Sequence, residues 1–243
     1  MIMSTCITEN LKNVLNGIRK AEKDAGRKEN SVNLLAVSKF HSVEEVLEAA
    51  EYGITSFGEN RVREAALKFT EVKKIFPDVK LHLIGHIQTN KVKKAVEIAD
   101  CIESVDSLAL ITEIEKAAAK IGKNINILLE LHTGEDSKYG FPSFTDLEDA
   151  LKYIAEGSAP HVIPCGFMTM APLSASPESP EVRRSFVTLR EIKERMQKRF
   201  PSFSLTELSM GMSSDFETAI EEGSTLVRIG TALFRNSGAE AQA

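Results

Sequence analysis

The sequence predicts a closed (β/α)8 barrel, in which parallel strands alternate with helices around a cylinder. Eight short apolar runs alternate with segments of helical periodicity, and strict strand–helix alternation implies parallel pairing. The chain has 243 residues, a length that such barrels use for one domain. An open doubly wound sheet is the alternative that this alternation also allows.

The expected strands are short, mostly apolar runs that are too short to form helices of their own. In chain order they are Val32–Ser38, Ile54–Phe57, Leu81–Gly85, Cys101–Val105, Ile125–Leu131, Val162–Phe167, Leu205–Met210 and Thr225–Gly230.

An additional amphipathic helix is expected before the first strand, because Leu11, Val14 and Ile18 recur at helical spacing. Little chain follows the last strand, so this helix is expected to cover part of the gap left by a short eighth helix. We expect a single domain over residues 1–243, with the first helix at about 3–26 and the barrel at about 32–234. The other helical patterns are Val43–Ala50, Ala65–Phe76, Val92–Ala99, Ile111–Ala118, Leu147–Ile154, Val182–Met196 and Phe216–Ile220.

Composition argues against several classes of protein. The net charge of −5 gives no electrostatic reason to bind nucleic acid or an anionic membrane. No uncharged apolar stretch is long enough to cross a bilayer, and residues 1–25 lack the apolar core of a signal peptide. Cys6, Cys101 and Cys165 form neither a metal-binding pattern nor a disulfide framework. We therefore expect a location in the reducing cytoplasm.

The unusual residues of the sequence follow the expected strands or lie at their carboxyl ends. Lys39 follows the first strand, and Arg228 interrupts the apolar last strand. In a barrel these ends form one rim, the catalytic face. We expect Lys39 to be desolvated there, as an amine that forms a Schiff base with a carbonyl compound. Two buried cations also indicate an anionic ligand, because burying them unpaired is costly.

The anion is expected to be a phosphate group. Gly211 and Ser213 precede the seventh helix, whose first turn offers backbone N–H groups and the positive end of a dipole. Gly230 and Thr231 add further donors after the eighth strand, and barrels often bind phosphate at these two loops. A carbonyl for Lys39 together with a phosphate site suggests pyridoxal 5′-phosphate (PLP) or a phosphorylated sugar aldehyde.

Motifs spread over residues 32–234 resemble those of the PLP homeostasis protein family. The resemblance covers nearly the whole chain, and the combined motifs are specific. They are Ala36–Lys39, Phe57–Arg61, His82–Lys91, Ser104–Ser107, Ser137–Phe141, Gly166–Met170, Leu208–Phe216 and Val227–Thr231.

The resemblance implies a barrel like the N-terminal domain of alanine racemase, with PLP held as a Schiff base. Lys39 matches the lysine that forms the Schiff base, and Arg228 matches the arginine that faces the pyridine nitrogen. The remaining matches are Ser213, Gly230 and Thr231 for the phosphate, and Asn60 and Met212 for residues that line the ring.

The implied role is to bind and supply PLP and to balance vitamin B6 and amino-acid pools, without robust catalytic activity. The resemblance further implies a monomer, with PLP-requiring apo-enzymes as candidate recipients. An arginine does not give up its proton, so the ring nitrogen facing Arg228 stays unprotonated and the ring is a poorer electron sink.

Two enzymatic alternatives are a PLP-dependent racemase of the alanine racemase type and a Schiff-base aldolase. Racemisation needs a proton donor on each face of the substrate. The sequence ends soon after the last strand, without the β-rich domain of alanine racemases, and its three tyrosines offer no clear second donor. An aldolase would explain Lys39 but not Arg228. Three matters stay open: the roles of His86 and Lys138, the partner of Glu59, and the contacts of Leu129–Thr133, which departs from the family pattern.

Overall fold

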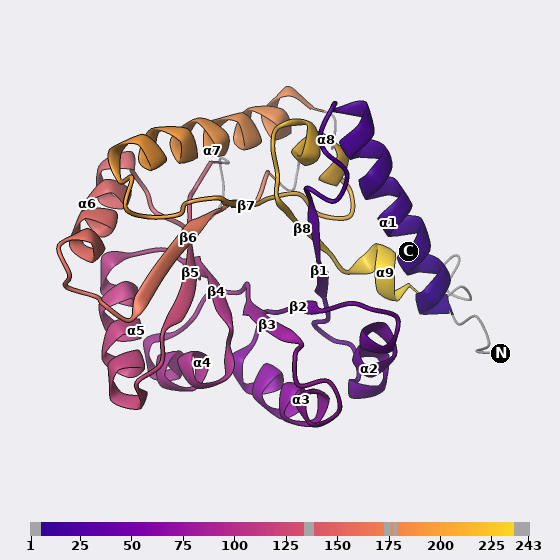
Figure 1. The fold of residues 1–243 in the computed structure, drawn as a ribbon, viewed down its shortest axis with the longest axis horizontal. Coiled ribbons are helices and arrows are strands. Elements are labelled where there is room, and N and C mark those ends of the chain that lie inside the picture. The colour runs from indigo at the N-terminus through magenta and orange to yellow at the C-terminus, as the bar shows by residue number, and fades with distance from the viewer. Residues whose placement is uncertain (1–5, 134–138, 173–175, 177–178, 236–243) are drawn as a thin grey trace.

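The computed structural model describes residues 6–133, 139–172, 176 and 179–235. Its strands close into a barrel in the order β1 to β8, surrounded by helices (Figure 1). Each strand pairs in parallel with the next, and β8 pairs in parallel with β1 through the register Ala36 to Ile229. The predicted (β/α)8 barrel is confirmed, and the open sheet is excluded because an open sheet has two unpaired edges.

The strands lie close to their predicted positions, with one informative difference. Gly58 and Glu59, expected just after the second strand, lie inside β2 and pair with His82 and Leu83 of β3. Continued ladder pairing with β3 therefore extends the strand beyond the apolar run that marks it in the sequence. The strands are β1 (Asn33–Val37), β2 (Ser56–Glu59), β3 (Lys80–Leu83), β4 (Cys101–Val105), β5 (Ile125–Glu130), β6 (Val162–Met168), β7 (Glu207–Ser209) and β8 (Leu226–Ile229).

The first helix packs against the short helices that end the chain, as predicted. α1 lies beside α8 and α9 (Figure 1), and the Asn10 side chain donates a hydrogen bond to the Leu233 carbonyl at 3.1 Å. Among the described residues, no helix is both long and apolar enough to cross a membrane. The helices are α1 (Cys6–Asp24), α2 (Val43–Glu51), α3 (Val62–Ile75), the 3-10 turn η1 (Thr89–Lys91), α4 (Val92–Ile98), α5 (Leu108–Ile121), α6 (Phe144–Ala155), α7 (Pro180–Arg199), α8 (Phe216–Glu221) and α9 (Thr231–Phe234).

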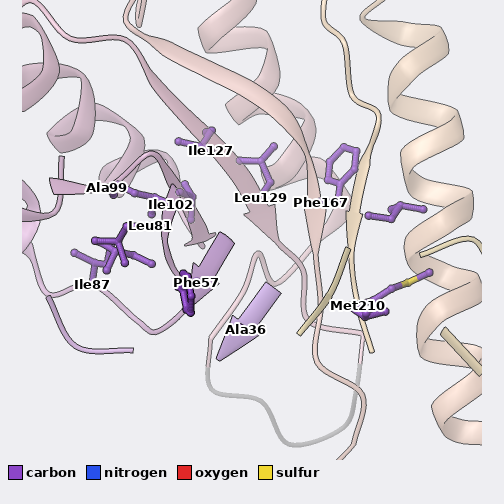
Figure 2. Close-up of a cluster of buried hydrophobic side chains, with 14 of the residues drawn as sticks. Ala36, Phe57, Leu81, Ile87, Ala99, Ile102, Ile127, Leu129, Phe167 and Met210 are labelled. Carbon is purple, nitrogen blue, oxygen red and sulfur yellow. The ribbon is translucent and has the colours of Figure 1, made fainter. Parts of the chain in front are cut away.

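The main apolar core lies between the strands and the surrounding helices. Figure 2 shows part of it, including the buried side chains of Ile102, Ile127 and Leu129. Side chains alternate between the two faces of a strand. Glu103, which follows Ile102, and Leu128, between Ile127 and Leu129, therefore face the barrel interior. The interior therefore holds the polar Glu103 beside a small apolar cluster of Cys101, Leu128 and Met168.

Glu22 joins α1 to the start of β1. Its carboxylate is 1% exposed and accepts hydrogen bonds from the Val32 backbone N–H at 2.7 Å and the Ser31 hydroxyl at 3.2 Å. Arg19 forms an ion pair with it. Burial tends to raise the pKa of Glu22, but the hydrogen bonds from Arg19 and Val32 hold that pKa below its usual value.

Replacing this carboxylate should destabilise the fold. We expect Glu22→Gln to lower the free energy of unfolding by about 1–3 kcal/mol. The glutamine amide carries no negative charge, and it has one acceptor oxygen fewer for the buried donors that bond Glu22. Urea unfolding followed by circular dichroism would measure the change. Glu29→Gln, at an exposed position of the same segment, is the matched control and should change the stability little. Equal stabilities for the two variants would contradict this account of Glu22.

Candidate functional site

A buried arginine lies inside the barrel. Arg228 on β8 is 5% exposed. Its Nη1 donates to the Ser209 carbonyl at 2.7 Å and to the Ser209 hydroxyl at 2.8 Å, and its Nη2 donates to the Thr169 carbonyl at 2.8 Å. A guanidinium has five N–H donors, so two of them have no hydrogen-bond partner among the described residues.

Arg228 is the end of a longer chain of hydrogen bonds. The Ser209 hydroxyl donates to Oε2 of Glu103 at 2.6 Å, and His82 Nδ1 contacts Oε1 of Glu103 at 2.6 Å. Glu103 lies on β4 and Ser209 on β7, which are not neighbours in the barrel, so their hydrogen bond crosses the interior. We call His82, Glu103, Ser209 and Arg228 the interior polar chain.

The positive charge of Arg228 interacts electrostatically with three carboxyl groups: Glu103, Glu130 and Asp215. Burial tends to raise the pKa of Glu103, but the hydrogen bond from His82 and the charges of His82 and Arg228 hold it below its usual value. Burial raises the pKa of Glu130 to about 7, against the opposing charge of Arg228. Burial likewise raises the pKa of Asp215. Glu103 is thus the one of the three carboxyls whose environment favours the charged form.

Lys39 lies at the rim but is exposed to solvent, so the expectation that it is desolvated is wrong for the protein alone. The chain turns immediately after β1, and Phe40 adopts a positive φ of 70°. The Lys39 Nζ lies 5.9 Å from the centroid of the Phe40 ring. An exposed amine is accessible to an incoming carbonyl compound.

The partner of Glu59 is a second lysine beside the end of β1. Lys68 Nζ donates to Oε1 of Glu59 at 2.6 Å and to the Ser38 carbonyl at 2.7 Å. The Ser38 hydroxyl donates to the same Glu59 oxygen at 2.8 Å. The other oxygen, Oε2, is buried without a hydrogen-bond partner among the described residues. Lys68 lies within an ordinary helical pattern, so nothing in the sequence marks it as a residue of this site.

The predicted phosphate residues come together where β1, β7 and β8 end. A Cβ on Gly230 would lie 2.9 Å from the Val37 carbonyl oxygen, so this approach to β1 requires glycine. The Ser213 hydroxyl accepts a long hydrogen bond of 3.5 Å from the Ala232 backbone N–H. Thr231, the first residue of α9, is exposed at this point.

Asn60 and Met212 are both half-buried at the rim. Gly85 packs against the backbone of Asn60, since a Cβ there would lie 2.5 Å from the Asn60 carbonyl oxygen. The Met212 N–H donates to the Asp215 carboxylate at 2.6 Å. These contacts place both residues at the ends of their strands, but none of them involves the side chain of Asn60 or Met212.

His86 contacts two other residues of the rim loops. Its Nδ1 lies 3.1 Å from the Asp106 carboxylate, and its ring stacks on Tyr139 with 4.4 Å between centroids. Lys138 lies outside the described residues.

Cavities open elsewhere on the barrel. One of about 600 Å³ lies at the amino-terminal ends of the strands, opposite the rim, and is lined by His82, Cys101 and Cys165 among others. Another of about 670 Å³ is lined by residues of the loop after β3 and of α5, including His86 and Asp106. Neither Lys39 nor Arg228 lines these two cavities.

Three interior residues were not among the predicted site residues: His82, Glu103 and Glu130. The signal that identified Arg228, a charged residue in an apolar strand, is also present at Glu103 within Cys101–Val105 and at Glu130 at the end of Ile125–Leu131. What the sequence does not contain is the pairing across the interior, which depends on barrel closure.

The chain is similar to curated proteins named pyridoxal phosphate homeostasis protein. The protein from Aquifex aeolicus is 40% identical over 232 residues, which cover 96% of this chain and 98% of that protein. The protein from Pseudomonas aeruginosa is 36% identical, with 98% of this chain and 100% of that protein covered.

Solved structures share the barrel. PipY of Synechococcus elongatus, solved without PLP, matches with a TM-score of 0.80 and 37% identity over 90% of this chain and 99% of that chain. The structure of PipY with PLP bound matches with a TM-score of 0.78. Alanine racemase from Streptomyces coelicolor is alike in fold alone, with a TM-score of 0.72, 19% identity, and 92% of this chain and 58% of that chain covered.

A family model described as "Alanine racemase, N-terminal domain" matches residues 10–237. It agrees with the barrel topology and with the likeness to the racemase structures. The two curated relatives above are 36–40% identical over 96–98% of this chain and share one name. The chain belongs to the pyridoxal phosphate homeostasis protein family.

Proposed function

We propose that this protein binds PLP at the carboxyl-terminal rim of the barrel, with Lys39 holding it as a Schiff base. The observation that carries the proposal is Arg228, a buried cation with two N–H groups unused by the described residues. It lies inside the barrel whose rim carries Lys39. The structure of the relative PipY with PLP bound supports the same ligand.

The described residues fit three of the polar groups of PLP: the aldehyde, the pyridine nitrogen and the phosphate. The Lys39 amine suits the aldehyde, and an unused N–H of Arg228 suits the lone pair of the pyridine nitrogen. Ser213, Gly230 and Thr231 supply hydroxyl and backbone donors for the phosphate, while Asn60 and Met212 lie on the same rim as candidates to line the ring. Bound PLP supplies an electrophilic aldehyde and a ring that accepts electrons. Arg228 keeps its own proton and leaves the ring nitrogen unprotonated, which weakens the second of these properties.

We further propose that the protein holds and supplies PLP, acting in the cytoplasm as a monomer with PLP-requiring apo-enzymes as recipients. Curated relatives at 31–40% identity are named homeostasis proteins. The alanine and histidine racemases among the solved structures are 13–19% identical. The second candidate function, amino-acid racemisation, is favoured only by the shared barrel.

Glu130 makes the net charge of this site depend on pH. It is 3% exposed at the end of β5 and interacts with Arg228 and Asp106. With a pKa of about 7, its carboxyl changes charge near neutral pH. The net charge around Arg228 therefore becomes more negative as the pH rises through this range.

Lys39→Ala should abolish covalent attachment of PLP, because the variant lacks the amine. The wild-type protein mixed with PLP should turn yellow, and borohydride reduction followed by peptide mass spectrometry should locate the adduct on Lys39. Lys80→Ala, at the opposite end of the barrel, is the control and should keep the adduct. An adduct on Lys68 of the wild-type protein would refute the assignment, since Lys68 is the other lysine beside the end of β1.

The PLP-loaded protein should not racemise alanine at the rates usual for enzymes, which are about 1–1,000 turnovers per second. The reason is that Arg228 leaves the ring nitrogen unprotonated, so the ring stabilises the substrate carbanion poorly. Chiral chromatography of the products would measure the rate, with an alanine racemase as positive control. Turnover within the enzymatic range would establish the racemase alternative instead.

Glu130→Gln should stabilise the ligand-free protein at alkaline pH. The pKa of Glu130 rises from 4.5 to about 7 on folding, so the unfolded chain loses this proton first as the pH rises. The wild type therefore loses up to about 3 kcal/mol of unfolding free energy between these values, and the variant does not. Urea unfolding at pH 4 and pH 8 should show that Glu130→Gln has a higher free energy of unfolding than the wild type only at pH 8. Glu51→Gln, an exposed control, should be as stable as the wild type at both pH values. An equal change of unfolding free energy between pH 4 and pH 8 in the wild type and in Glu130→Gln would contradict the prediction.

A further inference from the structure

The interior polar chain connects Arg228 to a carboxylate that does not contact it directly. Arg228 Nη1 donates to the Ser209 hydroxyl at 2.8 Å, and this hydroxyl donates to Glu103 at 2.6 Å. Ser209 and Glu103 are both fully buried. A serine hydroxyl has a single hydrogen to donate, so the direction of both bonds is determined: the serine accepts from the cation and donates to the anion.

The same contacts restrict the orientation of Arg228. Ser209 accepts two bonds from Nη1, through its carbonyl and its hydroxyl, and Thr169 accepts one from Nη2. Glu103 determines where the Ser209 hydroxyl points, and His82 holds the second oxygen of Glu103. The orientation of the two unused N–H groups of Arg228 therefore depends on a carboxylate from the other side of the barrel.

The charged groups around Arg228 differ in whether they interact with it through space or through hydrogen bonds. Glu130 of β5 and Asp215 before α8 interact with it through space. His82 of β3 reaches it only through Glu103. The neighbouring Cys101 thiol of β4 has a pKa well above its usual value because of burial and stays uncharged. Glu103 is the carboxylate linked to Arg228 by hydrogen bonds through one hydroxyl.

We propose that Glu103 is a positioning residue for the PLP site, which orients Arg228 through Ser209 and balances its charge. This inference rests on the proposed function. A purely structural role would need only that Glu103 satisfy its own buried partners. A positioning role means that its negative charge also influences the ligand that faces Arg228.

The charge of Glu103 should be visible in the absorption of bound PLP. A nearby negative charge favours the protonated, cationic form of a Schiff base. In Glu103→Gln the adduct should still form on Lys39. The pH midpoint of its visible band should fall by about one unit, because removing one negative charge near the site changes a proton equilibrium by roughly tenfold. Glu103→Asp keeps the charge, and its midpoint should return toward that of the wild type.

Ser209→Ala tests the orientation of Arg228 independently of the charge. It removes the hydroxyl between Arg228 and Glu103 and leaves both charges in place. We expect the dissociation constant for PLP, measured by absorbance titration, to rise by about tenfold, the effect of losing one hydrogen bond to a charged group. This variant also provides the decisive test if Glu103→Gln does not fold.

Glu22→Gln is the matched control, because Glu22 is also a buried carboxylate paired with an arginine but belongs to α1. Thermal unfolding of the ligand-free proteins should show both Gln variants to be less stable than wild type. The visible band and the PLP affinity should change only at Glu103 and Ser209. This comparison separates a loss of stability from an effect on the site.

The outcomes distinguish this inference from the proposed function. An adduct on Lys39 with an unchanged midpoint in Glu103→Gln and an unchanged affinity in Ser209→Ala would overturn the positioning role alone. A wild-type protein that forms no adduct would overturn the proposed function, and the positioning role with it. A shifted midpoint that Glu103→Asp restores would support both.

Discussion

The cation of Arg228 inside the barrel is the constraint on which the rest of the site depends. Burying a guanidinium requires hydrogen bonds and nearby negative charge. The structure supplies two carbonyls and one hydroxyl as direct acceptors, with Glu103 beyond the hydroxyl. A barrel with an apolar interior could not hold this group. Ser209 and Glu103, both fully buried, supply part of what this arginine requires.

The two principal residues of the site occupy contrasting environments. Arg228 is enclosed and held by three hydrogen bonds, whereas Lys39 is exposed on a turn. A rigid recognition group inside and an accessible amine at the rim suit a protein that takes up a ligand and gives it away. An enzyme would in addition need a second proton donor held opposite the amine. This contrast accords with a carrier of PLP.

The position of the site agrees with a general property of barrels, in which function resides at the carboxyl ends of the strands. Val37, Ser209 and Ile229 end their strands at this rim, and Gly211 and Gly230 follow the last two of these strands. A side chain at Gly230 would collide with the backbone of Val37. The opposite end contains a cavity that includes His82, so the interior polar chain reaches from that cavity to Arg228.

The sequence by itself determined the repeating architecture and most of the candidate site. Apolar periodicity predicted the strand Cys101–Val105 with its observed bounds, and the places of Lys39 and Arg228 at the ends of expected strands marked both as candidates. Three features were decided by the tertiary structure: the exposure of Lys39, the pairing of Glu59 with Lys68, and the hydrogen bond from Ser209 to Glu103. Periodicity and motifs describe neighbours along the chain. Contacts between β4 and β7 arise only when the sheet closes and brings distant side chains into one enclosed interior.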